Sequence, residues 1–339
     1  MSMVNTSVRT RILQGFDDPA LQSEQWQTLL QHSCTDEVFL TWHWLRSWWE
    51  SLGRGRLLLV AAECGGECVA LAPMYADSGM IYFLGSDVAD YLDFIGDTSD
   101  PAVLDALLET ARDCVPNFSG FRFYKILENS PTARRLPEAA RRLGLRCYEE
   151  KKWPAPSLDL AIKPALGKAA ADKKSLVRHE RYFRREGSLE VRHFSDGEAI
   201  RPHLGEFFEQ HISRWADTPY PSKLLDPRQR NLYHALTSIA AHTGWLRFTR
   251  IDWEGRPIAF HFGFCYRGSY FWYKPTFAID LARHSPGEVL LRQLLLAAAA
   301  EGASVFDFGL GDEAFKHRFA THVRHVQTWG LYPAKGPII

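Results

Sequence analysis

The chain reads Val305-Phe-Asp-Phe-Gly-Leu-Gly-Asp-Glu-Ala-Phe-Lys-His-Arg-Phe319 near its C-terminus, and this stretch decides the fold class. Its first four residues predict a short buried strand, interrupted by one carboxylate and ended by two glycines. Asp312 and Glu313 then indicate the start of a helix, because the first helical turn exposes unpaired N–H groups and the positive end of the helix dipole. A strand that ends in glycines and carboxylates and leads into a helix is typical of an active-site rim in α/β proteins. A plain strand–helix connection with a capping residue is the alternative.

Length and composition limit the possibilities. With 339 residues, the chain is too long for one ordinary core and predicts about two domains. Lys plus Arg and Asp plus Glu both number 40, so no global field points to nucleic acid or to an anionic membrane. The six cysteines are scattered, which predicts free thiols in a reducing cytoplasm and no metal site. We expect no signal peptide and no membrane span, and a cytoplasmic location.

The sequence contains an internal repeat. Residues 56–73 and 245–262 both read as a hairpin with a glycine turn, and aligning Gly66 with Gly255 also matches the flanking apolar residues. Both halves continue with an aromatic strand, a helix and a buried strand. These elements are predicted at 80–84, 101–115 and 121–126 in the first half, and at 270–273, 287–301 and 305–308 in the second. The shared order favours a duplication.

A basic segment lies between the halves. Residues 173–186 predict an amphipathic helix ended by Gly187, with Arg178, Arg181 and Arg185 on one face. The first interpretation is a solvated surface. The alternative is a phosphate clamp for a cofactor or an acidic substrate.

With the repeat and the terminal motif in view, the chain resembles the CelD-like branch of the GNAT superfamily, the acetyltransferases named for cellulose biosynthesis. The resemblance covers most of the chain. It rests on the sequences at 39–49, 91–95, 173–187, 207–208, 214–215, 285–287 and 306–316. This branch is similar in architecture to the Fem-type peptidyltransferases, which carry two GNAT-like domains in tandem. The resemblance therefore implies an α/β fold with mixed sheets flanked by helices, in domains at 1–155 and 156–339. The second domain would be catalytic and would include the basic linker helix.

The resemblance implies acyl transfer from acetyl-CoA, or another acyl-CoA, to an amine or sugar hydroxyl. The acceptor would be a small molecule or a polysaccharide precursor. In this fold the fourth and fifth strands splay apart around the thioester, and backbone N–H groups of the aromatic strand polarise its carbonyl. The cofactor pyrophosphate would lie at the start of the following helix. That loop maps onto Arg283, His284, Ser285, Pro286, Gly287 and Glu288, with Ser285 as the helix cap.

The sequence departs from the family in two places. The loop has fewer glycines than the usual pattern, and the first half has no comparable loop, so that half is expected to have lost cofactor binding. The family's closing motif has tyrosine at the positions of Phe315 and His317, where a tyrosine often protonates the leaving thiolate. Lys316, His317 and Tyr273 are the remaining candidates for this acid.

Three carboxylates compete for the role of general base: Asp307, Asp312 and Glu313. Burial in an apolar strand would raise the pKa of Asp307 into a useful range if its side chain faces the cleft. If the side chain faces inward, Asp307 is a structural hydrogen-bonding residue. Asp312 and Glu313 could instead cap the helix and bind the substrate amine.

Candidate substrate-binding residues come from both halves. His261 lies between two phenylalanines on a strand and faces the opposite way, toward the substrate or into the core. Asp90, Tyr91 and Asp93 could bind a polar acceptor across an interdomain cleft, or could form a hydrogen-bonded turn.

Two other functions stay open. One is a Fem-like peptidyltransferase that takes aminoacyl-tRNA, and tRNA is a partner only under this hypothesis. The basic helix favours it and the neutral overall charge opposes it. The other is a non-catalytic, degenerate GNAT fold that acts as a binding module.

Overall fold

The structure, a computed structural model, describes residues 7–161 and 165–334, and the chain divides into two compact units. One unit holds the chain up to Pro154 together with the segment from Arg324 onward, and the other holds Ala155–Val323. Sequence analysis places the boundary after residue 155 and keeps all later residues together. The C-terminal strand instead counts with the first unit, because it pairs antiparallel with a strand of that unit at Val326–Leu331.

The first unit is a mixed sheet with helices. Its strands are ordered β1-β2-β3-β4-β6-β13, and β5 pairs with β3; β4 and β6 are parallel. The elements are β1 (Arg9–Leu13), α1 (Ser23–Gln31), α2 (Trp42–Leu52), β2 (Arg56–Cys64), β3 (Glu67–Asp77), β4 (Met80–Phe83), β5 (Ile95–Gly96), α3 (Pro101–Asp113), β6 (Gly120–Leu127), α4 (Pro131–Arg142) and β13 (His322–Pro333).

The second unit repeats this plan. Its strands are ordered β7-β12-β11-β10-β9-β8, and β11 and β12 are parallel. The elements are the end of β7 (Leu145–Asp159), α5 (Ala165–Ala171), α6 (Lys174–Glu186), β8 (Leu189–Phe194), α7 (Gly197–Ile200), α8 (Leu204–Trp215), α9 (Pro227–Ser238), α10 (Ala240–Thr243), β9 (Leu246–Trp253), β10 (Arg256–Tyr266), β11 (Ser269–Phe277), α11 (Pro286–Ala300), β12 (Val305–Asp307) and α12 (Ala314–His317). Short 3-10 turns lie at Val38–Leu40, Arg201–His203, Lys223–Leu225 and Ile279–His284.

The structure confirms the predicted element order of both halves. Each has a glycine-turn hairpin, an aromatic strand, a helix and a strand parallel to the aromatic one. The basic helix also forms: α6 begins at Lys174 and ends at Glu186, before Gly187.

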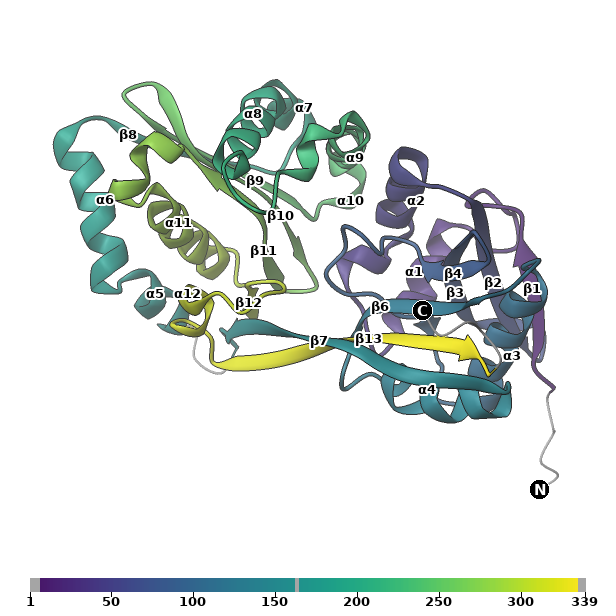
Figure 1. The fold of residues 1–339 in the computed structure, drawn as a ribbon. Coiled ribbons are helices and arrows are strands. Elements are labelled where there is room, and N and C mark those ends of the chain that lie inside the picture. The colour runs from purple at the N-terminus through teal and green to yellow at the C-terminus, as the bar shows by residue number, and fades with distance from the viewer. Residues whose placement is uncertain (1–6, 162–164, 335–339) are drawn as a thin grey trace. The chain divides into compact units, whose positions relative to one another are not determined.

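Helices cover the two faces of the second sheet (Figure 1). Helices α5, α6 and α11 lie on one face, over a core that includes Tyr270, Trp272 and Leu294. Helices α8 and α9 lie on the other, where Phe207 of α8 and Tyr233 of α9 contact Phe262 of β10. Because alternate strand residues face opposite sides, β10 and β11 supply both cores.

All six cysteines are free thiols. Within residues 7–161 and 165–334, no helix has the length and apolar content needed to cross a membrane.

A histidine ring fixes the middle of β10. His261 is fully buried, and its Nε2 lies 3.0 Å from the Phe271 carbonyl oxygen and 3.3 Å from the Tyr273 backbone nitrogen. The register between β10 and β11 shifts between Phe262 and Phe264. A Cβ on Gly263, the residue within this shift, would lie 2.2 Å from Cε1 of the His261 ring. Glycine is therefore required because the histidine ring occupies the space of a side chain.

We expect Gly263→Ala to destabilise the second unit by about 1–3 kcal/mol or more, because the ring and the Phe271 carbonyl must both move. Chemical denaturation measures this change. Gly205→Ala is the matched control: Gly205 lies in α8 with nothing near its Cβ position, so alanine there should be neutral or stabilising. Equal unfolding free energies for the wild type and Gly263→Ala would contradict the packing described here.

Candidate active site

The second unit contains a strand edge that loses its partner. Strand β11 pairs with β12 only over Ser269–Phe271, opposite Val305–Asp307. Beyond Phe271, β11 continues to Phe277, whereas β12 ends at Asp307 and the chain turns at Gly309, whose φ is 67°. The two parallel strands therefore separate at the point where the sequence places the aromatic strand and the acidic motif.

Asp307 lies at this separation but faces inward. Its side chain is fully buried, and Oδ1 accepts a hydrogen bond of 2.8 Å from the Gly309 N–H. The backbone N–H of Phe308, which lies between Asp307 and Gly309, donates to the Pro156 carbonyl at 3.1 Å. Of the two alternatives for Asp307, the structure shows the buried one, in which the carboxylate holds the turn that ends β12.

The other charged residues of the motif pair with one another. His317 Nε2 lies 2.7 Å from Asp312 Oδ1, with side-chain exposures of 39% and 77%. Lys316 Nζ lies 2.9 Å from Glu313 Oε2 and donates to the Leu310 carbonyl at 2.6 Å. The Lys316 side chain is buried, so the His317–Asp312 pair is the more accessible of the two.

The predicted capping by the two acids is wrong. Helix α12 is a single short turn, Glu313 occupies its N-cap position, and no side-chain capping hydrogen bond forms there. The physical reason is that Lys316 and His317 of the same segment take the two carboxylates instead.

Tyr273, the remaining candidate for the acid, and Phe315 both lie in aromatic surroundings. Tyr273 is 7% exposed and its ring centroid lies 5.1 Å from that of Phe264. Phe315, at the position of the family's tyrosine, packs edge to face on Trp272 at 6.3 Å.

The loop before α11 begins the helix as predicted, with Pro286 in its first turn, but Ser285 does not cap it. Ser285 has a left-handed backbone, φ 58°, and its side chain accepts no capping hydrogen bond. Its carbonyl oxygen instead accepts the N–H of Glu288 at 3.0 Å. A Cβ on Gly287 would lie 3.0 Å from the Phe277 ring, so glycine allows the helix start to approach the end of β11.

Side chains from three segments meet at this helix start. Glu288, in the first turn of α11, lies 3.2 Å from Arg318 and 3.4 Å from His179 of α6. His284 stacks on Tyr182 of α6, with ring centroids 4.2 Å apart, and its Nε2 accepts from Arg283. Arg318 thus connects the segment after β12 with the cofactor loop predicted from sequence.

The predicted substrate residues occupy buried positions. His261 faces the core, where burial lowers its pKa to about 3. In the first unit, Tyr91 is buried beneath Arg324, whose Cζ lies 4.8 Å from the ring. Asp93 accepts hydrogen bonds from Thr35 and Ser130, and burial raises its pKa. Asp90 is half-buried. Thr35 and Ser130 are distant from Asp93 in sequence, so these contacts are tertiary and not those of a local turn. Substrate binding by Asp90, Tyr91 and Asp93 stays a prediction.

Sequence analysis missed polar residues on α8, where it used Arg214 and Trp215 only as family markers. Gln210 and Arg214 lie one turn apart on α8, and Arg214 donates to the Pro275 carbonyl of β11 at 3.0 Å. The spacing of four residues is a signal that could have placed them on one face.

Comparisons with known proteins agree with this geometry. Residues 171–317, which include β11, α11 and β12, match the model of the family described as an acetyltransferase (GNAT) domain. A search of curated proteins found no match. The crystal structure of FemX has a TM-score of 0.65 at 12% identity, covering 91% of this chain and 96% of that one.

Two further structures have similar folds. A tandem GNAT protein from the clavulanic acid biosynthesis pathway has a TM-score of 0.52 at 10% identity, covering 97% of this chain and 100% of that one. The C-terminal domain of a putative lysylphosphatidylglycerol synthetase from Agrobacterium fabrum has a TM-score of 0.56 at 14% identity, and 91% of each chain is covered. The chain therefore has a GNAT-like α/β fold, and its second half is similar in sequence to a GNAT acetyltransferase domain. The CelD-like branch stays a prediction.

Two buried histidines predict acid sensitivity. Burial lowers the pKa of both His261 and His211 to about 3, and the nearby cations Lys274 and Arg214 add to the effect on His211. Between pH 6.5 and about 3 the unfolded chain binds protons that the folded chain does not, so stability falls as the pH falls. Each histidine contributes a slope of about 1.4 kcal/mol per pH unit within that window.

We expect His211→Asn to reduce this slope by about one histidine's share, measured by urea denaturation from pH 7 to pH 4.5. The variant has one group fewer that titrates only on unfolding. An unchanged slope would show that His211 is protonated in the folded protein.

Proposed function

We propose that the second unit catalyses transfer of an acyl group from acyl-CoA to an amine or hydroxyl of a small molecule or saccharide. One observation carries the proposal: β11 separates from β12 after Phe271, and its far end lies against the start of α11, where Phe277 is next to Gly287. An open strand edge offers backbone N–H groups to a carbonyl oxygen, and the helix start offers its dipole to phosphate. The match of the same residues to a GNAT acetyltransferase domain supports this.

The start of α11 fits an anionic cofactor group, although one carboxylate already lies in its first turn. The helix spans 15 residues, Gly287 lies in its first turn, and Arg283 and Arg318 lie beside it. Glu288 places a carboxylate in the same turn, where Arg318 lies 3.2 Å and His179 3.4 Å from it. Phosphate would compete with this carboxylate for Arg318. When bound, acyl-CoA supplies the thioester that activates the acyl group.

For proton transfer we propose His317, oriented by Asp312. This pair combines a hydrogen bond of 2.7 Å with exposure to solvent. His317 accepts the proton that leaves the attacking amine or hydroxyl as the new acyl bond forms and the carbon–sulfur bond breaks. Asp312 holds the ring and stabilises the imidazolium, as in other histidine–carboxylate pairs. The buried Asp307 supports the turn and takes no part in the proton transfer.

Calorimetry with acetyl-CoA tests the cofactor and Glu288 together. We expect binding by the wild type, and several-fold tighter binding by Glu288→Gln, because the variant removes a negative charge and frees Arg318 for phosphate. Glu313→Gln is the control, since its carboxylate pairs with Lys316 instead. Failure of folded wild type to bind acetyl-CoA at millimolar concentration would reject the cofactor proposal.

His317→Asn should lower kcat by about 10²–10⁴-fold, with little change in the affinity for acetyl-CoA. Release of free thiol from acetyl-CoA, with a panel of amines and amino sugars as acceptors, measures the rate. Asp312→Asn should cause a smaller loss of kcat. Lys316→Met breaks the ion pair of the buried Lys316 with Glu313 and measures how much that disturbance alone lowers kcat. Full activity of His317→Asn would assign the base to another group.

A second candidate function is transfer from aminoacyl-tRNA. It is favoured by the exposed face of α6, where a groove is lined by Lys174, Arg178, Arg181, Arg185 and Arg292, and by the similarity to the FemX structure. Phosphate binding by this face would weaken steeply with salt. Salt-dependent binding of tRNA together with absent turnover of acetyl-CoA would favour this function over the first.

A further inference from the structure

Helix α8 carries a polar stripe on the side that faces the sheet. His203, Glu206, Gln210 and Arg214 follow one another at intervals of three or four residues, which places them on one helical face. Their contacts lie on β9, β10 and β11. The two ends of this stripe differ in how their charges are neutralised.

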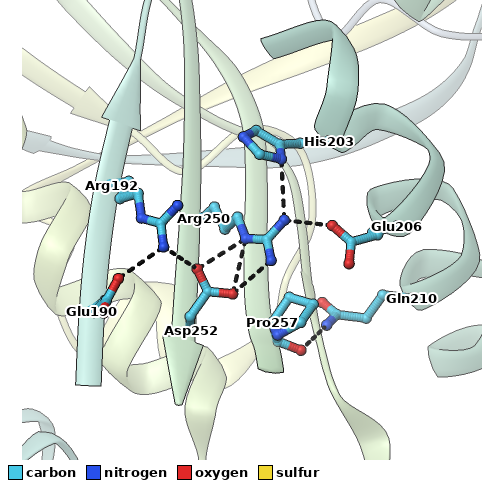
Figure 2. Close-up of polar contacts among 8 residues, drawn as sticks. All are labelled: Glu190, Arg192, His203, Glu206, Gln210, Arg250, Asp252 and Pro257. Carbon is cyan, nitrogen blue, oxygen red and sulfur yellow. Dashed lines mark hydrogen bonds and ion pairs between the residues drawn. The ribbon is translucent and has the colours of Figure 1, made fainter. Parts of the chain in front are cut away.

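At the first end, the charges pair with one another (Figure 2). The Arg250 guanidinium lies 2.8 Å from the buried Asp252 carboxylate, contacts Glu206, and donates to His203 at 3.1 Å. Arg192 of β8 connects the same Asp252 with Glu190. This network ties α8 to β8 and β9, and each arginine in it has a carboxylate partner.

At the other end, Arg214 has no such partner. Its guanidinium donates to the Pro275 carbonyl at 3.0 Å and lies over the Phe277 ring, with Cζ 4.1 Å from the centroid, and beside the Trp215 ring at 5.2 Å. Within residues 7–161 and 165–334, no carboxylate forms an ion pair with it. Burial lowers the pKa of Arg214 only to about 10, so the group stays charged at neutral pH.

Unpaired polar atoms gather around this arginine. Oε1 of Gln210, Nε1 of Trp215 and Oγ1 of Thr276 are buried and have no hydrogen-bond partner in the part of the chain that the structure describes. Gln210 lies one turn before Arg214, with its Nε2 on the Pro257 carbonyl (Figure 2), and Thr276 follows the proline that Arg214 contacts. Buried polar groups are nearly always satisfied, so a cluster of exceptions indicates a site built for a ligand.

The neighbouring His211 does not supply the missing negative charge. His211, on the same helix, shares a hydrogen bond of 2.8 Å with Ser222 Oγ, and burial with the cations Lys274 and Arg214 keeps it neutral. Lys274 adds a second positive charge close by. The positive charge at this site would therefore be balanced by a bound anion.

We propose that Arg214 binds a carboxylate or phosphate group of the acceptor substrate, with Thr276 and Trp215 as further hydrogen-bond donors. The planar guanidinium fork matches both oxyanions, and the Phe277 ring holds its plane. Helices α8 and α11 cover opposite faces of the sheet (Figure 1), and the Phe277 ring at the end of β11 lies next to both Arg214 and Gly287 at the start of α11. A group bound by Arg214 would therefore lie beside the donor's phosphates without sharing their helix start, which assigns it to the acceptor. That assignment rests on the proposed acyl transfer, whereas the anion site itself does not.

Thermal unfolding of the full chain tests the anion site without any need for turnover. Wild type, Arg214→Met and Arg250→Met are compared in sodium chloride, sodium acetate and sodium phosphate at equal ionic strength. In chloride, Arg214→Met should unfold at the wild-type temperature or above, because it removes a partly desolvated charge without a counterion. Arg250→Met, the matched control, should unfold at a lower temperature because the buried Asp252 loses its nearer partner and keeps only Arg192, at 3.5 Å.

Acetate or phosphate at about five times its Kd should raise the unfolding temperature of wild type and Arg250→Met by about 2–4 °C, and leave Arg214→Met unchanged. A gain with acetate alone identifies a carboxylate site, and a gain with phosphate alone a phosphate site. The proposal is overturned if neither anion stabilises the wild type, or if Arg214→Met gains as much as the wild type.

A kinetic measurement then tests the role in acceptor binding. With an amino acid acceptor and its amide as a pair, Arg214→Lys should raise KM for the amino acid by at least about tenfold, leave kcat nearly unchanged, and leave the amide unaffected. Equal changes for the acid and the amide would remove the acceptor assignment. If acetyl-CoA turnover were absent, a rise in unfolding temperature with acetate or phosphate would still support the anion site. The anion site and the proposed acyl transfer can therefore be rejected independently.

Discussion

The pairing of β11 with β12 ends at Phe271, and the rest of the candidate site depends on this limit. A parallel ladder needs both strands to continue, and the turn at Gly309 removes one of them. Asp307 stabilises that turn by accepting the Gly309 N–H inside the core. A buried carboxylate within an apolar strand is costly unless it is hydrogen-bonded, and here it is used to stop the strand. The edge of β11 that remains then leads to the start of α11, which Gly287 allows to lie against Phe277.

Most charged side chains next to this strand edge pair with a nearby side chain. The motif after β12 pairs Asp312 with His317 and Glu313 with Lys316, so four of its charged residues satisfy one another. Such local pairs contribute little to stability when exposed, and they leave the solvent-facing histidine oriented. The exception on the other face of the sheet is Arg214. An arginine without a carboxylate partner can bind an anion without first giving up an ion pair.

The sequence allowed the fold to be predicted in some detail, because glycine turns, apolar strands and the Pro286 helix start are local signals. The aligned hairpins predicted the repeated order, and the family resemblance indicated where β11 and β12 separate. What local signals could not supply was the partner of each polar side chain. Ser285 is a common cap residue, yet its left-handed backbone prevents capping. Asp307 and His261 lie in strands, as predicted. The alternation of side chains along a strand could not show whether each of them faces a cleft or the core.

The first unit shows that the shared topology is not enough to form such a site. There β4 and β6 are parallel over Met80–Tyr82 and Gly120–Arg122, as β11 and β12 are in the second unit. However, β4 ends at Phe83, whose ring packs against those of Phe94 and Phe123, and the chain then turns instead of continuing as an open edge.

The two units also differ in the hydrogen bonds of their buried acids. Asp93 is held by the hydroxyls of Thr35 and Ser130 inside a closed loop, whereas Asp307 is held by a backbone N–H at the end of a strand. The first arrangement closes the space beside the parallel pair with core residues, and the second leaves a strand edge beside it. The sheet plan is therefore common to both units, although the surroundings of the parallel pair differ. The length of β11 beyond its partner, rather than the repeat itself, distinguishes the second unit.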